Sequence, residues 1–147
     1  MAAVSALRST TGTSVEFRVI TAVSSVSVVV SDQDRSLAFY TEKLGFELQM
    51  DAPMGQSRWI QLAPKGAQTS LVLGKPTEDM PPEIYARTKS MLGGFVNFIF
   101  NVDDMQATYT ELSGRGVEFV DQPAQQPWGW WASIKDPDGN IIGLHHQ

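Results

Sequence analysis

The sequence repeats one pattern, first as Val26-Ser27-Val28-Val29-Val30-Ser31-Asp32 and about 72 residues later as Phe95-Val96-Asn97-Phe98-Ile99-Phe100-Asn101-Val102-Asp103-Asp104. Each stretch is rich in β-branched or aromatic residues and ends at an aspartate, which is typical of a strand that leads into a helix. Apolar residues then recur three and four positions apart over 34–44 and over 105–115, which predicts a helix in each place. Glycine closes both helical patterns. The repeat indicates a duplicated module.

Three strand-like segments follow each predicted helix. They lie at 46–50, 57–63 and 69–73 in the first half, and at 117–120, 130–135 and 140–145 in the second. A turn signal, Asp136-Pro137-Asp138-Gly139-Asn140, separates the last two strands. The sequence therefore predicts an α+β fold of two β-α-β-β-β modules.

The predicted modules cover 21–74 and 95–147 and together form one domain. The linker, 75–94, contains three prolines and a predicted helical turn at 83–91. Residues 1–20 read as a leader that is mobile or ends in a short strand over 15–20, because they lack the charge and apolar pattern of a secretion signal.

Composition narrows the function classes. Of 147 residues, 42% are hydrophobic and 18% are charged, and the net charge is −5, which is typical of a globular domain and unfavourable for binding nucleic acid. There is no cysteine, so disulfides and thiolate chemistry are excluded. No apolar run approaches the ~20 residues that span a bilayer. We expect a cytoplasmic protein without a membrane partner.

The repeat resembles the vicinal oxygen chelate superfamily, which includes glyoxalase I, bleomycin-resistance proteins and extradiol dioxygenases. The resemblance covers 23–145 and rests on five pieces taken in order: Val30-Ser31-Asp32, Ser36-Leu37-Ala38-Phe39-Tyr40, Leu44-Gly45-Phe46, Pro127-Trp128-Gly129, and Asp136-Pro137-Asp138-Gly139-Asn140-Ile141-Ile142. The Pro-Trp-Gly piece is most similar to the bleomycin-resistance-like branch. The resemblance implies two βαβββ modules that form a cupped, partly open, mixed β-sheet barrel with flanking helices. It also implies a homodimer whose cleft lies in the cup or is shared with the partner chain.

The metal-using members of this superfamily line the cup with four side chains, usually histidine or glutamine on each first strand and glutamate on each last strand. Carried over by position, these places fall at Ser25, Val72, Asn97 and Gly143. Serine is a poor ligand for a divalent metal, and valine and glycine side chains offer none. We therefore expect no metal and no other cofactor.

Histidine offers one way around this conclusion. His145 has the same strand parity as Gly143, so both residues face the cup if the strand is regular. His146 then faces the helix side or solvent. The alternative is that both histidines lie at the end of the chain without a ligand-binding role.

Tryptophan supplies the clearest binding signal. Trp128, Trp130 and Trp131 lie within four residues, and Trp59 lies on a strand of the other module. Trp131 stands where superfamily members often carry arginine, and its broad face can stack on a planar ligand or hold a cation. We expect Trp59, Trp128 and Trp131 to bind ligand, although Trp128 can equally serve to pack the strand entry.

Strand alternation predicts the polar wall of the cup. Ser25 and Ser27 share one face of the first strand, and Asn97 and Asn101 share one face of its counterpart. These groups orient a ligand by hydrogen bonds but supply no strong base. The charged residues Glu47, Asp51 and Arg58 read more simply as solvated edge charges.

The sequence leads to three hypotheses. The first is a protein that binds a small apolar or aromatic molecule in a metal-free cleft, for example to sequester an antibiotic or toxin, through the residues Ser25, Ser27, Trp59, Asn97, Asn101, Trp128, Trp131 and His145. The second is an enzyme of the same superfamily, a metal-dependent lyase or dioxygenase with a displaced metal site or a metal-free isomerase. The third is a non-catalytic dimeric module with a vestigial cleft. The fold alone cannot choose among them.

Overall fold

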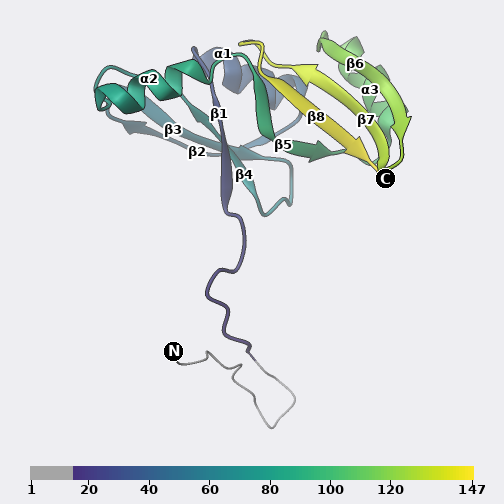
Figure 1. The fold of residues 1–147 in the computed structure, drawn as a ribbon, viewed down its shortest axis with the longest axis horizontal. Coiled ribbons are helices and arrows are strands. Elements are labelled where there is room, and N and C mark those ends of the chain that lie inside the picture. Colours follow the sequence, from purple (N-terminus) through teal and green to yellow (C-terminus); the bar gives the residue numbers. More distant parts are fainter. Residues whose placement is uncertain (1–14) are drawn as a thin grey trace.

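The computed structural model describes residues 15–147 and contains two four-stranded mixed sheets, one from each module (Figure 1). The first sheet has the order β1-β4-β3-β2, in which β1 and β4 are parallel and the other pairs are antiparallel. Its strands are β1 (Ser25–Val29), β2 (Glu47–Met54), β3 (Ser57–Ala63) and β4 (Ser70–Gly74). The parallel pair results from the helical crossover that separates β1 from the rest of the module.

The second sheet repeats this topology in the order β5-β8-β7-β6, with β5 and β8 parallel. Its strands are β5 (Phe95–Asn101), β6 (Phe119–Gln126), β7 (Gly129–Lys135) and β8 (Ile141–His146). The helices are α1 (Gln33–Ala38) and α3 (Met105–Gly114) in the crossovers, and α2 (Pro82–Ser90) in the linker. The duplicated βαβββ architecture and the α+β class are confirmed.

The first helix differs from its prediction. The helical pattern over 34–44 is split into α1 and a π-helical turn, η1 (Phe39–Lys43), in which the Leu44 N–H donates to the Phe39 carbonyl at 3.2 Å. The wider turn shifts the helical phase, so the neighbouring rings of Phe39 and Tyr40 are both buried. A simple 3.6-residue period predicts only Tyr40 to point inward.

Gln33 fastens α1 to the first sheet. Its side-chain amide donates to the carbonyls of Arg58 on β3, at 2.7 Å, and Leu73 on β4, at 2.9 Å. Its side-chain carbonyl accepts from the Arg58 N–H at 3.1 Å. Since Gln33 is only 5% exposed, these bonds satisfy backbone groups that water reaches poorly.

The two sheets share a single hydrophobic core. One face of the first sheet contributes Val28, Ile60 and Leu73, and one face of the second contributes Ile134 and Leu144. The rings of Phe46 and Phe100 meet between the modules with their centroids 5.2 Å apart. We call the opposite face of each sheet its cup face. Because both core faces pack on the same cluster, the two cup faces of one chain point away from each other.

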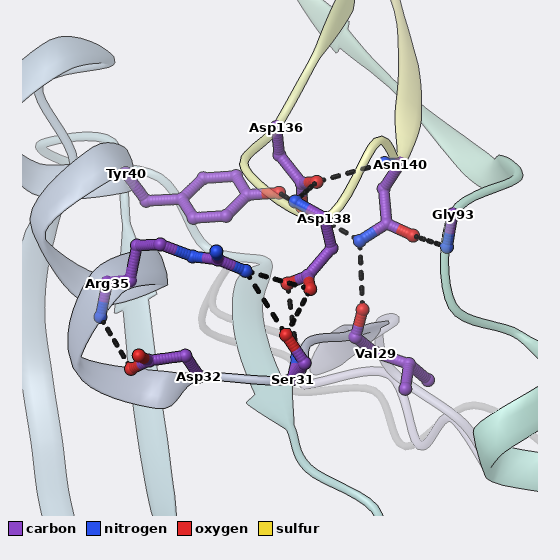
Figure 2. A network of polar contacts seen from close by, with 9 residues as sticks. All are labelled: Val29, Ser31, Asp32, Arg35, Tyr40, Gly93, Asp136, Asp138 and Asn140. Carbon is purple, nitrogen blue, oxygen red and sulfur yellow. Dashed lines mark hydrogen bonds and ion pairs between the residues drawn. The ribbon is translucent and has the colours of Figure 1, made fainter.

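The turn between β7 and β8 joins the modules through a polar network (Figure 2). The buried Asp136 carboxylate accepts from the Tyr40 hydroxyl at 2.8 Å and from the Asn140 side-chain amide at 2.8 Å. That amide also donates to the Val29 carbonyl at 2.8 Å, at the end of β1. Asp138 pairs with Arg35 at 3.0 Å and accepts from Ser31. The residues predicted as a turn therefore also hold the second module to the first.

The segment 15–22 extends away from both sheets (Figure 1), and no strand forms over 15–24 in this structure. Several of its apolar side chains are exposed, among them Phe17 and Ile20. The earlier part of the predicted leader, 1–14, lies outside the described residues. Within residues 15–147, no helix is both long and apolar enough to cross a membrane.

Candidate ligand-binding cleft

The cup face of the first sheet is polar and uncharged. Register pairs Ser25 with Ser70 and Ser27 with Val72 across β1 and β4, and both Ser25 and Ser27 are exposed. Gln61 and Trp59 continue this face on β3. This wall therefore offers hydroxyl and amide groups beside one large aromatic ring, as the strand alternation predicts.

A chain of hydrogen bonds fixes the side chains of this wall. The Trp59 indole N–H donates to the Gln61 side-chain carbonyl at 3.1 Å. The Gln61 amide donates to Gln49 at 3.0 Å and to Ser70 at 3.2 Å, and the Ser70 hydroxyl donates to Gln49 at 2.6 Å. Gln49, Gln61 and Ser70 are not among the site residues predicted from the sequence. A register shift between Leu48 and Met50 breaks the alternation of β2, so a period of two cannot place Gln49.

The cup face of the second sheet begins with β5. Asn97, Ile99 and Asn101 are exposed on this strand, whereas Phe98 and Phe100 pack against the core. The pairing of β5 with β8 shifts register between Phe95 and Ile99, but the in-and-out alternation persists along the strand. Both asparagines therefore lie on the face that the sequence predicts for them.

Trp131 covers the position of the superfamily's last metal ligand. Its six-membered ring lies directly over Gly143: a Cβ atom added to Gly143 would meet Cζ3 at 3.0 Å, Cζ2 at 2.5 Å and Cη2 closer still. Real Cβ atoms do not approach carbon this closely, so any side chain at 143 would displace the indole. An aromatic ring thus fills the space from which a glutamate would reach a metal.

His145 is the cross-strand partner of Trp131 on the same cup face. Its Nε2 lies 2.8 Å from the carbonyl oxygen of Trp128. The close approach of the His145 ring to this carbonyl depends on a glycine at position 129. A Cβ atom there would lie 3.0 Å from His145 Nε2 and 2.6 Å from the His146 carbonyl oxygen. The φ angle of Gly129 is also +118°, which favours glycine. The Trp128 side chain is 59% exposed, so within one chain it does not serve as buried packing for the strand entry.

The remaining polar candidates lie elsewhere. His146 Nδ1 accepts from the Met105 N–H at 3.1 Å, at the first turn of α3. Arg58 binds Asp51 at 2.9 Å and Asp34 at 2.7 Å. The hydrogen bonds and charge of that guanidinium hold the pKa of the Asp51 carboxyl below its usual range. These groups have structural partners and do not form part of a cup face.

The chemistry of the four superfamily positions does not fit a divalent metal. Ser25, Val72, Asn97 and Gly143 offer a hydroxyl, an amide and no carboxylate or imidazole. Elsewhere in residues 15–147, no group of three or more histidine or acidic side chains is arranged to hold an ion.

The structure does not bring all the predicted site residues together within one chain. Ser25, Ser27 and Trp59 lie on the first cup face, and the other five lie on or beside the second. A groove of about 1030 Å³ does exist between the modules, but core-facing residues and α3 supply most of its lining. Among the predicted binding residues it touches Asn101 alone, and it contains no tryptophan.

Comparison with known proteins gives concordant matches. The sequence pattern of the Glyoxalase/Bleomycin resistance protein/Dioxygenase superfamily matches residues 22–144. TnmS3, an antibiotic binding protein from Streptomyces sp. CB03234, is 42% identical with a TM-score of 0.71, over 88% of this chain and 98% of that one. The uncharacterized protein YetH of Bacillus subtilis is 37% identical, over 83% of this chain and 95% of its own length. A probable lactoylglutathione lyase from Synechocystis is 32% identical, over 78% and 87% respectively.

Proposed function

Since the chain belongs to the Glyoxalase/Bleomycin resistance protein/Dioxygenase superfamily, we propose that it binds a small, flat, largely apolar or aromatic molecule without a metal. Binding would sequester an antibiotic or another toxic compound in the cytoplasm. Stacking and apolar burial supply the affinity, at about 25 cal/mol per Å² of buried apolar surface before ordering costs are subtracted.

One observation carries this proposal. The indole of Trp131 covers Gly143, so the place of a metal ligand is taken by a surface suited to stacking. The two cup faces also carry aromatic and uncharged polar groups, namely Trp59, Ser25, Ser27, Asn97, Asn101 and His145. The similarity to TnmS3, described as an antibiotic binding protein, supports the same kind of ligand.

In this proposal a second copy of the chain completes the cleft. The outer strands β2 and β6 contain Pro53 and Pro123, which discourage further strand pairing. The opposite edge strands, β1 and β5, contain neither proline nor charge. Their free edges and outward cup faces suit a homodimer in which each cleft joins the first module of one copy to the second module of its partner.

Calorimetric or fluorescence titration with a panel of planar antibiotics tests the proposal. Trp131→Ala should weaken the binding of any hit by about tenfold or more. Ala67→Trp, which adds bulk to the groove between the modules, should leave the affinity unchanged. Unchanged affinity in Trp131→Ala together with weaker binding in Ala67→Trp would indicate that the ligand binds in the groove and not on the cup face.

Elemental analysis of protein purified without chelator tests the alternative, a metal-dependent lyase or dioxygenase with a displaced site. The similarity to a probable lactoylglutathione lyase is the observation that keeps this alternative in view. Stoichiometric zinc, iron or nickel would overturn the metal-free proposal. A protein free of these metals that still binds planar compounds would support it.

A further inference from the structure

The second cup face carries an aromatic surface next to a histidine whose tautomer is fixed. Trp131 and His145 are directly paired across β7 and β8, so their side chains are neighbours on one face. The Trp128 carbonyl can only accept a hydrogen bond, and it lies 2.8 Å from His145 Nε2. A neutral His145 therefore carries its proton on Nε2.

This tautomer leaves Nδ1 of His145 as an acceptor. Within residues 15–147 the Nδ1 atom makes no hydrogen bond, and the side chain is only half-buried. His146 has a different role, since its Nδ1 accepts from the backbone of α3 on the other side of the sheet. Of the two histidines, His145 is the one available to a molecule lying on Trp131.

The other flank of the Trp131 ring also favours hydrogen-bond donors. Ser133 pairs with Gly143 across β7 and β8, and its hydroxyl donates to the Asp121 carboxylate at 2.7 Å. Asp121 is exposed, so its remaining oxygen can accept another donor. An anionic group at this place would face a carboxylate and would be disfavoured.

We propose that Trp131 and His145 together select flat aromatic molecules that carry a hydroxyl or amino donor at the edge. The ring stacks on Trp131, and the donor is accepted by His145 Nδ1. This inference rests on the proposed function and adds the chemical class of the ligand. It makes His145 a specificity-determining residue.

A pair of fluorescent probes, 1-hydroxypyrene and 1-methoxypyrene, tests this inference on the full chain. They share one aromatic surface and differ in whether the edge oxygen can donate. The wild type should prefer the hydroxyl probe by about threefold to tenfold, the effect of one hydrogen bond. His145→Phe should remove this preference, and Trp131→Leu should weaken both probes by a similar factor.

His146→Gln is the matched control, because it replaces the other histidine and retains an acceptor for α3. It should keep the wild-type preference. The ¹⁵N NMR signals of the imidazole give a second readout that needs no ligand and no variant, and a proton on Nδ1 would overturn the inference.

The outcomes separate the two proposals. Trp131-dependent binding of both probes with equal affinity would overturn the inference and leave the proposed function standing. Persistence of the hydroxyl preference in His145→Phe would assign the contact to another acceptor. Binding of neither probe would count against both proposals.

Discussion

Gly143 shows how one missing side chain can determine the chemistry of a site. Register places Gly143 of β8 beneath Trp131, and the indole ring carbons lie too close to Gly143 for a Cβ atom to fit. A glycine here is required by the close approach of the ring and not by an unusual backbone angle. The residue acts through the tryptophan that it accommodates.

Gly143→Ala should therefore lower the free energy of unfolding by about 1 to 3 kcal/mol, the usual cost of overpacking. Urea titration followed by circular dichroism measures the loss. Gly94→Ala is the control, because a Cβ at Gly94 meets nothing within 4 Å. Equal stabilities of the two variants would contradict the placement of Trp131.

Tyr40 is the second residue whose environment gives a clear expectation. Burial, and then the nearby Asp136 carboxylate, raise the pKa of the Tyr40 hydroxyl well above its ordinary value. Since the folded-state pKa is raised, the hydroxyl stabilises the fold fully below the unfolded pKa of about 10. This contribution is lost progressively as the pH rises above that value.

Tyr40→Phe should lower the free energy of unfolding by about 1 to 3 kcal/mol at pH 7, because the Asp136 carboxylate loses a buried donor. It should also make stability fall less steeply between pH 10 and pH 11 than in the wild type, which is the range about the unfolded tyrosine pKa. Denaturant titrations at a series of pH values measure both effects. Tyr109→Phe is the control, and an identical alkaline slope in all three proteins would refute the assignment.

At the scale of elements, α1 depends on one glutamine more than on its own length. Six residues make a helix too short to be stable alone. Asp32 caps its first turn by accepting from the Arg35 N–H at 3.0 Å. The Gln33 side chain then forms hydrogen bonds with backbone groups of β3 and β4, as the backbone of an adjacent strand would.

Gln33→Ala should cost about 2 to 4 kcal/mol, because it leaves three poorly hydrated backbone groups without partners. Gln61→Ala removes only bonds between side chains on the cup face and should cost less than about 1 kcal/mol. Thermal unfolding of the two variants gives the comparison. A smaller loss for Gln33→Ala than for Gln61→Ala would contradict this account of how α1 is held.

Local patterns in the sequence predict most elements but not the contacts between them. The strand β3 lies where its alternation predicts. The helix α2 is shifted by one residue at each end from its predicted bounds, and α3 begins at the predicted residue and ends one residue earlier. The strands β2 and β6 extend beyond prediction, to Met54 and Gln126, because hairpin pairing continues through polar residues and proline. The β-propensities of individual residues do not predict pairing that continues through such residues.

In the candidate site, too, local patterns predict where single residues lie but not which residues they contact. Alternation, with the aromatic side of the strand assigned to the core, is sufficient to place Asn97 and Asn101 on a cup face. For the tryptophans, alternation assigns one of Trp130 and Trp131 to that face, and the resemblance to the superfamily indicates Trp131. The contact of Trp131 with Gly143 and the bond from His145 to the Trp128 carbonyl depend on cross-strand register, which one strand's sequence does not specify. The link from Tyr40 to Asp136 spans 96 residues and carries no local signal.

At the scale of the whole molecule, the exposed side of β5 is the feature to test. Phe95 and Ile99 are 71% and 55% exposed there, and large apolar groups in such a place mark an interaction surface. They adjoin the unprotected edge of the strand. Both observations are accounted for if a second copy covers this side of the second sheet.

Ile99→Lys should raise the dissociation constant of the proposed dimer at least about tenfold, which corresponds to about 1.4 kcal/mol. Analytical ultracentrifugation over a range of concentrations measures the change. Ile84→Lys on α2 is the control, since Ile84 is similarly exposed but lies outside the cup faces. A wild-type protein that stays monomeric at high concentration would rule out the shared cleft.

The network at Asp136 also makes the two halves unequal. Its aspartates and asparagine lie in the β7–β8 turn, whereas the matching β3–β4 loop reads Pro64-Lys65-Gly66-Ala67-Gln68-Thr69. Eight residues beyond the capping aspartate, the first helical region has Tyr40 and the second has Leu112. The β7–β8 turn of the second module therefore binds the first module, and within residues 15–147 the β3–β4 loop makes no equivalent contact with a tyrosine in the second. After duplication the two halves differ, because the first supplies the tyrosine hydroxyl and the second supplies the carboxylate that accepts from it. A chain built from two copies of either half would therefore lack this hydrogen bond between the modules.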